Sequence, residues 1–142
     1  QFQYIVSPLQ YQLRNRLLIM IEPKDFLDSA HAMIGQDEIG NRNAVSRMYY
    51  GVYHTGLLYA RSSLGFKYQT GSSLHKQLID FFKNQNQKNL KVIGRQMEKL
   101  RNARNEADYT LTTYVSPDDA RLDLRLPLQT VTQIEQAKKQ SI

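Results

Sequence analysis

The chain has 142 residues, a formal net charge of +6 and no cysteine. Its length suits one domain with its own core, and the absence of cysteine excludes disulfides and thiolate metal sites. The three histidines lack the spacing of a zinc motif, so we expect no metal and no cofactor. The positive charge favours a polyanionic partner, although it serves solubility equally well. The longest apolar run, residues 17–21, is too short to cross a membrane, so we expect no membrane contact. The absence of cysteine is compatible with a reducing cytoplasm, where we expect the protein.

The first residues differ from the rest of the chain. Residues 1–19 precede Met20-Ile21-Glu22-Pro23, and Met20 is a plausible natural N-terminus of the protein. We therefore expect residues 1–19 to be an N-terminal extension, either an upstream region or a remnant of expression. Residues 20–142 are expected to form one helical domain.

Two helices are predicted in the first half of this domain. The first begins at Pro23, because proline suits the first helical position, and reaches Gly35. A polar turn at 40–43 then precedes a helix over about 43–64. This second helix ends before the glycine-flanked segment 65–71, which is expected to be a loop.

Three further helices are predicted in the second half. Ser72 or Ser73 caps a short helix, and a polar linker leads into a helix over about 90–109. The last helix starts with a serine cap, a proline and two carboxylates at 116–119, and its apolar stripe includes Leu128. Pro127 lies inside this helix and predicts a kink or a break. Together these segments predict an all-α antiparallel bundle of four to five helices.

The helix over 90–109 places polar side chains on one face. The residues at i, i+3, i+4 and i+7 spacing are Arg101, Arg104, Asn105 and Asp108. The apolar stripe on another face consists of Ile93, Met97, Leu100, Ala103 and Ala107. The polar face suits a phosphate or a partner's carboxylate. The alternative is a structural Arg104–Asp108 ion pair, with Tyr109 sealing the end of the core.

The second helix carries a related face. Arg47, Tyr50 and His54 are spaced at i, i+3 and i+7, so Arg47 and Tyr50 can face the same cleft as Arg104. His54 would be the imidazole available to that cleft, although a packing role beside neighbouring tyrosines is the simpler interpretation. His31 and His75 are interpreted as surface or packing residues.

Two motifs occur in an order and separation typical of one known family. Ser46-Arg47 is followed by Tyr49-Tyr50 and His54, and Arg104-Asn105 is followed by Ala107-Asp108-Tyr109. Through these two motifs the chain resembles the HEPN domains, small prokaryotic helical-bundle proteins of toxin-antitoxin and phage-defence systems. The resemblance extends over residues 22–137. The resemblance implies a HEPN-like bundle, a homodimer, RNA as the target and a minimal nucleotidyltransferase as a partner protein.

The resemblance also implies site residues. Ribonuclease members carry arginine followed after four to six residues by histidine, and here Arg104 and Asn105 match while Tyr109 stands in place of the histidine. Tyrosine, with a pKa near 10, is roughly three to four pH units less suited than histidine to act as a base. The candidate catalytic residues are thus Arg104, Asn105 and Tyr109. The candidate phosphate- or nucleotide-binding residues are Arg101, Arg47, Asp108 and His54.

Two functions follow from these residues. The first is an RNA-acting protein, either a weakened metal-independent ribonuclease or an RNA-binding relative. The second is a non-catalytic module that binds a nucleotide or a partner protein. The retained arginine and asparagine favour the first, whereas the missing histidine favours the second.

Overall fold

The computed structural model describes residues 21–140, apart from the side chains at 122 and 123. This range contains helices and no strand. The five helices are α2 (Pro23–Met33), α3 (Glu38–Ser63), α4 (Leu74–Lys83), α5 (Lys88–Tyr109) and α6 (Pro117–Gln140). The predicted all-α bundle is therefore confirmed, while the expectation for residues 1–19 falls outside the described range.

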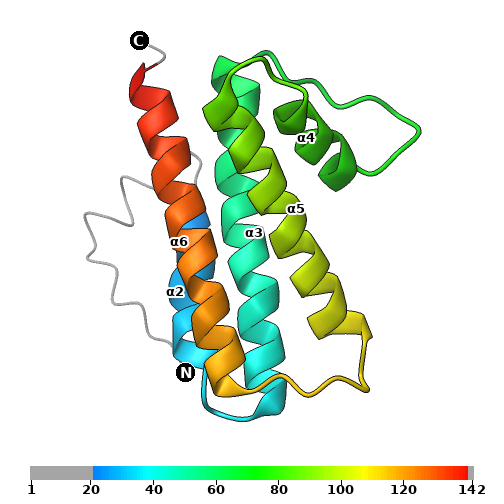
Figure 1. Ribbon diagram of the computed structural model, residues 1–142, viewed down its shortest axis with the longest axis vertical. Coiled ribbons are helices and arrows are strands. Elements are labelled where there is room, and N and C mark those ends of the chain that lie inside the picture. Colours follow the sequence, from blue (N-terminus) through cyan, green and yellow to red (C-terminus); the bar gives the residue numbers. More distant parts are fainter. Residues whose placement is uncertain (1–20, 141–142) are drawn as a thin grey trace.

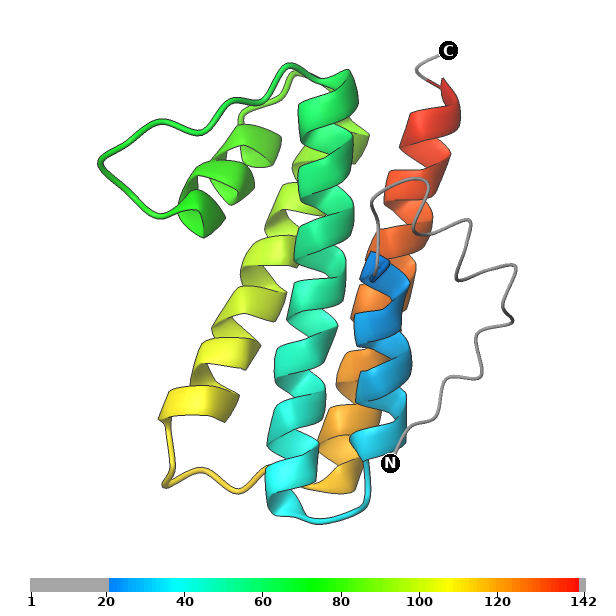
Figure 2. The same ribbon diagram turned by 180° about the vertical axis from the view of Figure 1, so that it is seen from behind.

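The long helix α3 lies in the middle of the bundle. Figures 1 and 2 show α2 and α6 packed on one side of it and α5 on the other, with the short α4 standing outside α5 at one end. The long helices that follow one another along the chain run in opposite directions (Figure 1). None of the helices within residues 21–140 has the length and apolarity that a membrane crossing requires.

The start of α3 differs from the sequence prediction. The helix begins at Glu38 rather than near residue 43, so the polar segment 40–43 is helical and is no turn. The Asp37 side chain caps the helix by accepting a hydrogen bond from the Gly40 amide at 2.7 Å. The segment is polar for a different reason, because the buried side chains of Asn41 and Arg42 bind other parts of the backbone.

Arg42 holds the end of α5 against α3. Arg42 is 5% exposed, and its guanidinium donates to the carbonyl oxygens of Ala107 at 2.9 Å and Thr110 at 3.0 Å and also to that of Thr113. Its Nε pairs with Glu38 at 2.9 Å. A helix leaves its last carbonyl groups without helical partners, and a buried cation satisfies them here. The position of the last turn of α5 is thereby set by α3.

The last helix has its predicted start, and of the predicted kink or break at Pro127 the break is wrong, because the helix is continuous. Ser116 and Asp119 cap α6 reciprocally, with each side chain accepting from the other residue's amide. The helix continues through Pro127, which is buried. Pro127 and Thr130 occupy the inward face, and Leu128, about 100° away from Pro127 around the helix, is 50% exposed. Packing of this face against the bundle offsets the backbone bond that proline removes.

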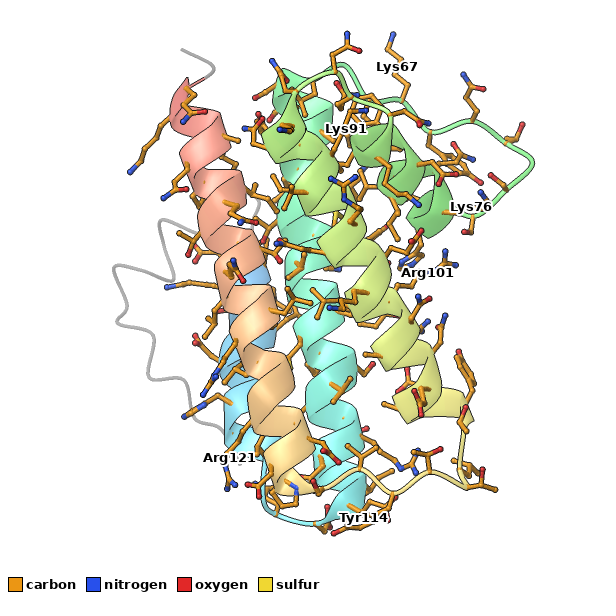
Figure 3. The ribbon with its side chains drawn as sticks, in the orientation of Figure 1. Lys67, Lys76, Lys91, Arg101, Tyr114 and Arg121 are labelled. Atoms are coloured by element: carbon orange, nitrogen blue, oxygen red, sulfur yellow. The ribbon has the colours of Figure 1, made fainter. Side chains whose placement is uncertain are left out.

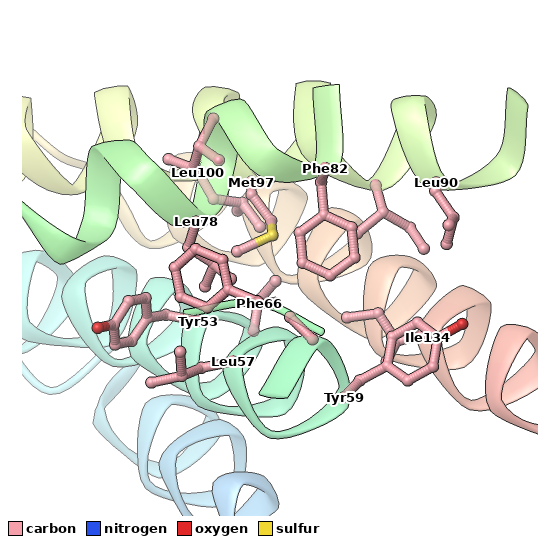
Figure 4. Packing of buried hydrophobic residues seen from close by; sticks show 14 of the residues in the cluster. Tyr53, Leu57, Tyr59, Phe66, Leu78, Phe82, Leu90, Met97, Leu100 and Ile134 are labelled. Carbon is pink, nitrogen blue, oxygen red and sulfur yellow. The ribbon is translucent and has the colours of Figure 1, made fainter. Parts of the chain in front are cut away.

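The main core lies between α3, α4, α5 and α6. Figure 4 shows aromatic side chains of α3 and α4, among them Tyr59 and Phe82, packed with Met97 of α5 and Ile134 of α6. Helix α4 approaches α5 closely at Gly94, where an added Cβ would lie 2.7 Å from the backbone nitrogen of Lys83. This close approach holds α4 along the first half of α5.

Candidate functional site

The packing of α4 on α5 brings six polar and aromatic side chains together where α3, α4 and α5 meet. We call this group the Arg104 cluster. It consists of Tyr49, Tyr50 and Tyr53 from α3, His75 from α4, and Arg101 and Arg104 from α5. Figure 3 shows Arg101 at the side of α5, near the beginning of α4.

Arg104 is held by contacts on three sides. Its Nη2 donates to the Tyr50 hydroxyl at 2.7 Å, and its Nη1 donates to Oδ1 of Asn105 at 2.9 Å. Its Nε lies 3.0 Å from Oδ2 of Asp108, an ion-pair distance, although the buried Nε hydrogen is not aimed well enough for a hydrogen bond. Asp108 also accepts from Ser46 of α3 at 3.2 Å. The predicted Arg104–Asp108 ion pair is therefore confirmed, and it forms part of a wider network.

Two aromatic rings flank the Arg104 guanidinium. Its central carbon lies 5.3 Å from the ring centre of Tyr50 and 5.6 Å from that of Tyr109, both within the range of cation–π attraction. Tyr109 is 71% exposed. The expectation that Tyr109 seals the core is therefore wrong, because the buried end of α5 is closed by Arg42 and the backbone that it binds.

His75 is the residue that sequence reasoning left out of the site. Its Nδ1 lies 2.6 Å from the Tyr49 hydroxyl, and its ring stacks on Tyr53 with centres 4.1 Å apart. Burial, followed by the nearby guanidinium groups of Arg101 and Arg104 and by His54, lowers the pKa of His75. No local pattern marks this histidine, since its place depends on how α4 packs.

The charge states in the cluster follow from this burial. The Tyr49 hydroxyl is buried, which raises its pKa well above 10, although Arg101 and Arg104 oppose the shift. Burial also raises the pKa of Tyr53. At neutral pH Tyr49 and Tyr53 are therefore protonated and the imidazole of His75 is neutral, beside the guanidinium groups of Arg101 and Arg104.

The other predicted site residues separate into different places. His54 is half-buried and stacks on Phe26 of α2 at 5.1 Å and on Tyr50 at 6.3 Å, and burial lowers its pKa. This geometry agrees with the packing interpretation, at the border of the cluster. Arg47 is exposed and takes no part in the contacts described above. His31 is exposed on α2.

The arrangement suits an anion better than a metal. Within residues 21–140 no group of three histidine or carboxylate side chains is placed to hold a metal ion. Arg101 makes no hydrogen bond or ion pair with the described part of the chain, so its five N–H donors are available to a ligand. A planar guanidinium matches the geometry of a phosphate or carboxylate.

Comparisons with other proteins add no relative to this description. No family model, no curated protein and no solved structure matches the chain. The assignment of a function therefore depends on the side chains of the Arg104 cluster.

Proposed function

We propose that this chain is a HEPN-type RNA-binding protein of a toxin-antitoxin or phage-defence system, and that the Arg104 cluster binds an RNA phosphate. The observation that carries the proposal is the pairing of a fixed guanidinium, Arg104, with an available one, Arg101, one turn away on α5. The two motifs that resemble the HEPN family supply the side chains on both sides of this contact, Tyr50 from α3 and Arg104 from α5. The net charge of +6 adds a general attraction for a polyanion.

The two arginines have different roles, because Arg104 is paired with other side chains and Arg101 makes no hydrogen bond or ion pair in the described part of the chain. Asp108 and Tyr50 fix Arg104, which provides oriented positive potential, whereas Arg101 can turn its donors toward phosphate oxygens. The exposed ring of Tyr109 provides a surface on which a base can stack. A single-stranded RNA offers both a phosphate and an unpaired base, so it is the form we expect to bind.

Binding should exceed cleavage under this proposal. A tyrosine stands at position 109 in place of the histidine, and a phenol is less suited than an imidazole to accept a proton at neutral pH. Arginines that neutralise a phosphate without an efficient proton acceptor stabilise the bound state more than they accelerate the reaction.

Salt-dependent binding tests the proposal. A fluorescent 12-nucleotide single-stranded RNA is titrated with protein at about 50 and 200 mM salt, and affinity should fall with salt by a log–log slope of about 0.7 for each phosphate contact. Arg101→Gln and Arg104→Gln should each weaken binding and reduce that slope. Arg121→Gln is the control, because Arg121 is exposed and pairs with Asp118 at the start of α6. Absence of binding at low salt, or equal affinity of Arg104→Gln and the control, would contradict the proposal.

A second function is favoured by a separate observation. Four large apolar side chains are exposed at the end of the bundle where α3 begins and α5 ends, the region of Tyr114 in Figure 3. One lies at the start of α3 and three lie at or after the end of α5, and we call this group of residues the end patch: Ile39, Tyr109, Leu111 and Tyr114. Exposed apolar patches mark surfaces for protein contact. A protein-binding module, with a nucleotidyltransferase as its partner, is the alternative function that fits the end patch.

A further inference from the structure

A cavity of about 230 Å³ lies between α4 and α5, next to the Arg104 cluster. Ile79 forms an apolar part of its wall and is itself 3% exposed. The polar side chains that line the cavity include Asp80 from α4 and Glu98, Arg101, Asn102 and Asn105 from α5. The volume is below the roughly 300–1,000 Å³ typical of sites for drug-sized ligands. It therefore suits one flat part of a larger ligand, such as a single nucleobase.

We propose that this cavity is a guanine-binding subsite, which rests on the proposed RNA function because it accepts the base beside a phosphate at the Arg104 cluster. Arg101 donates two parallel N–H groups from one edge of its guanidinium to O6 and N7 of guanine, and its remaining N–H groups are those that reach the adjacent phosphate. Asp80 and Glu98 offer acceptors for the N1–H and N2–H₂ groups of the same base.

The choice of guanine follows from the N–H donors of Arg101 and from the acceptor positions that remain on Asp80 and Glu98. Arg101 makes no hydrogen bond or ion pair within residues 21–140, and a guanidinium bidentate to O6 and N7 is the commonest specific contact to guanine. Adenine would turn an N6–H₂ donor toward these donors, and cytosine would turn its N4–H₂ donor the same way. Uracil has no N7, so it would receive one bond from Arg101 where guanine receives two.

The carboxylates keep acceptor capacity although each is paired. Asp80 accepts from Lys76 at 2.7 Å, and Glu98 accepts from Lys83 at 2.8 Å. A carboxylate has about four lone-pair positions, so each can accept a further hydrogen bond.

Asn105 connects the subsite to the phosphate site. Its carbonyl oxygen accepts from Arg104 at 2.9 Å, so its NH₂ group is the part that remains to donate into the cavity. One residue thus contacts Arg104 and lines the cavity. Figure 3 shows Arg101 and Lys76 close to each other, at the side where α4 begins.

The test compares four five-nucleotide RNAs that differ only at the centre, UUGUU, UUAUU, UUCUU and UUUUU, at about 50 mM salt, and repeats each titration at about 200 mM salt to obtain the salt slope. UUGUU should bind about 5- to 150-fold more tightly than the others, the range expected for one good bidentate contact. Arg101→Lys retains the charge and loses the fork, so it should bring the four affinities close together while the salt slope stays nearly unchanged. Arg95→Lys, at an exposed position of α5 outside the cavity, should retain the preference.

The outcomes separate the subsite from the function. Equal affinity for the four RNAs, a preference for another base, or a guanine preference that survives Arg101→Lys would overturn the subsite and leave RNA binding standing. Failure of all four RNAs to bind would overturn the proposed function and the subsite together. Asp80→Asn provides a second variant, expected to reduce the guanine preference, and circular dichroism shows whether each variant is folded.

Discussion

The Tyr49 hydroxyl lies 2.6 Å from Nδ1 of His75, although the two residues are 26 positions apart on different helices. The imidazole also stacks on Tyr53, so both its position and its orientation are determined by α3. This contact makes α4 part of the Arg104 cluster.

Tyr49→Phe removes the hydrogen bond to His75 and leaves Nδ1 without its partner. Loss of one partner of a buried hydrogen bond costs about 1–3 kcal/mol, so the free energy of unfolding in urea should fall by that amount. Tyr114→Phe serves as the control, because Tyr114 is 65% exposed, and it should change stability little. Equal stability of both variants would show that the Tyr49–His75 bond contributes nothing.

Stability should depend on pH through His75. Burial and the two arginines lower its folded-state pKa below the reference value of 6.5. The unfolded chain therefore binds the proton first, so the free energy of unfolding falls as pH decreases through 6.5 and levels off below the folded-state pKa. The contribution of His75 is fully present above pH 6.5, and urea unfolding between pH 7.5 and 5.5 should reveal its loss.

Histidine variants show which residue causes this pH dependence of stability. His75→Gln should flatten the stability profile below pH 6.5, because it removes a group whose neutral form the fold prefers. His31→Gln replaces an exposed histidine and should leave the profile unchanged. A profile identical in the wild type and His75→Gln would mean that other groups cause the acid loss, with His54 the next to be tested, since burial lowers its pKa too.

Arg42→Gln should destabilise the end of α5. The variant removes a buried guanidinium that donates to the carbonyl groups of Ala107, Thr110 and Thr113, and hydrogen bonds from a charged group contribute about 1.5–3 kcal/mol. We expect a loss of about 2–3 kcal/mol in unfolding free energy and faster amide exchange over 107–113. Arg47→Gln, an exposed position on the same helix, should change stability by less than about 0.5 kcal/mol.

Tyr109→His should increase RNA cleavage without added metal. The Tyr109 ring lies 5.6 Å from the Arg104 guanidinium, so an imidazole introduced there can act beside the bound phosphate. General acid–base catalysis by a well-placed group is worth about 10²- to 10⁴-fold, and gel analysis of labelled RNA in the presence of a chelator measures it. Tyr114→His, at another exposed tyrosine of the end patch, is the control. Rapid cleavage by the wild type that persists in Arg104→Ala would instead place the reaction at another imidazole, and His54 and His75 would be tested first.

The resemblance to HEPN domains leads us to expect a homodimer. Light scattering at micromolar concentration should give about twice the 16.5 kDa chain mass. If the end patch forms the contact, Leu111→Asp should yield the single-chain mass, because it places a charge on a leucine that is 79% exposed. Leu58→Asp alters an exposed leucine on α3 outside the end patch and should leave the dimer intact. A single-chain mass for the wild type would mean association weaker than about 8 kcal/mol.

The helices themselves were predictable because their signals are local. Pro23, Ser73, Ser116 and Pro117 mark helix starts through backbone chemistry that depends on near neighbours, and these starts agree with the structure. The helical spacing from Arg101 to Asp108 likewise predicted a shared polar face and the Arg104–Asp108 ion pair. Local periodicity therefore determined the fold class and half of the candidate site.

The remaining features depended on contacts between helices. The polar composition of 40–43 led to the prediction of a turn. In the structure Asn41 and Arg42 are buried, and their side chains donate to backbone carbonyl groups that follow α5. His75 joined the site because Gly94 lets α4 lie against α5, which places the imidazole on Tyr49 and Tyr53. A sequence by itself determines which face of each helix is apolar, since that depends on spacing within one segment. Only the tertiary structure decides which polar groups meet across helices, because that depends on the depth and the angle at which the helices pack.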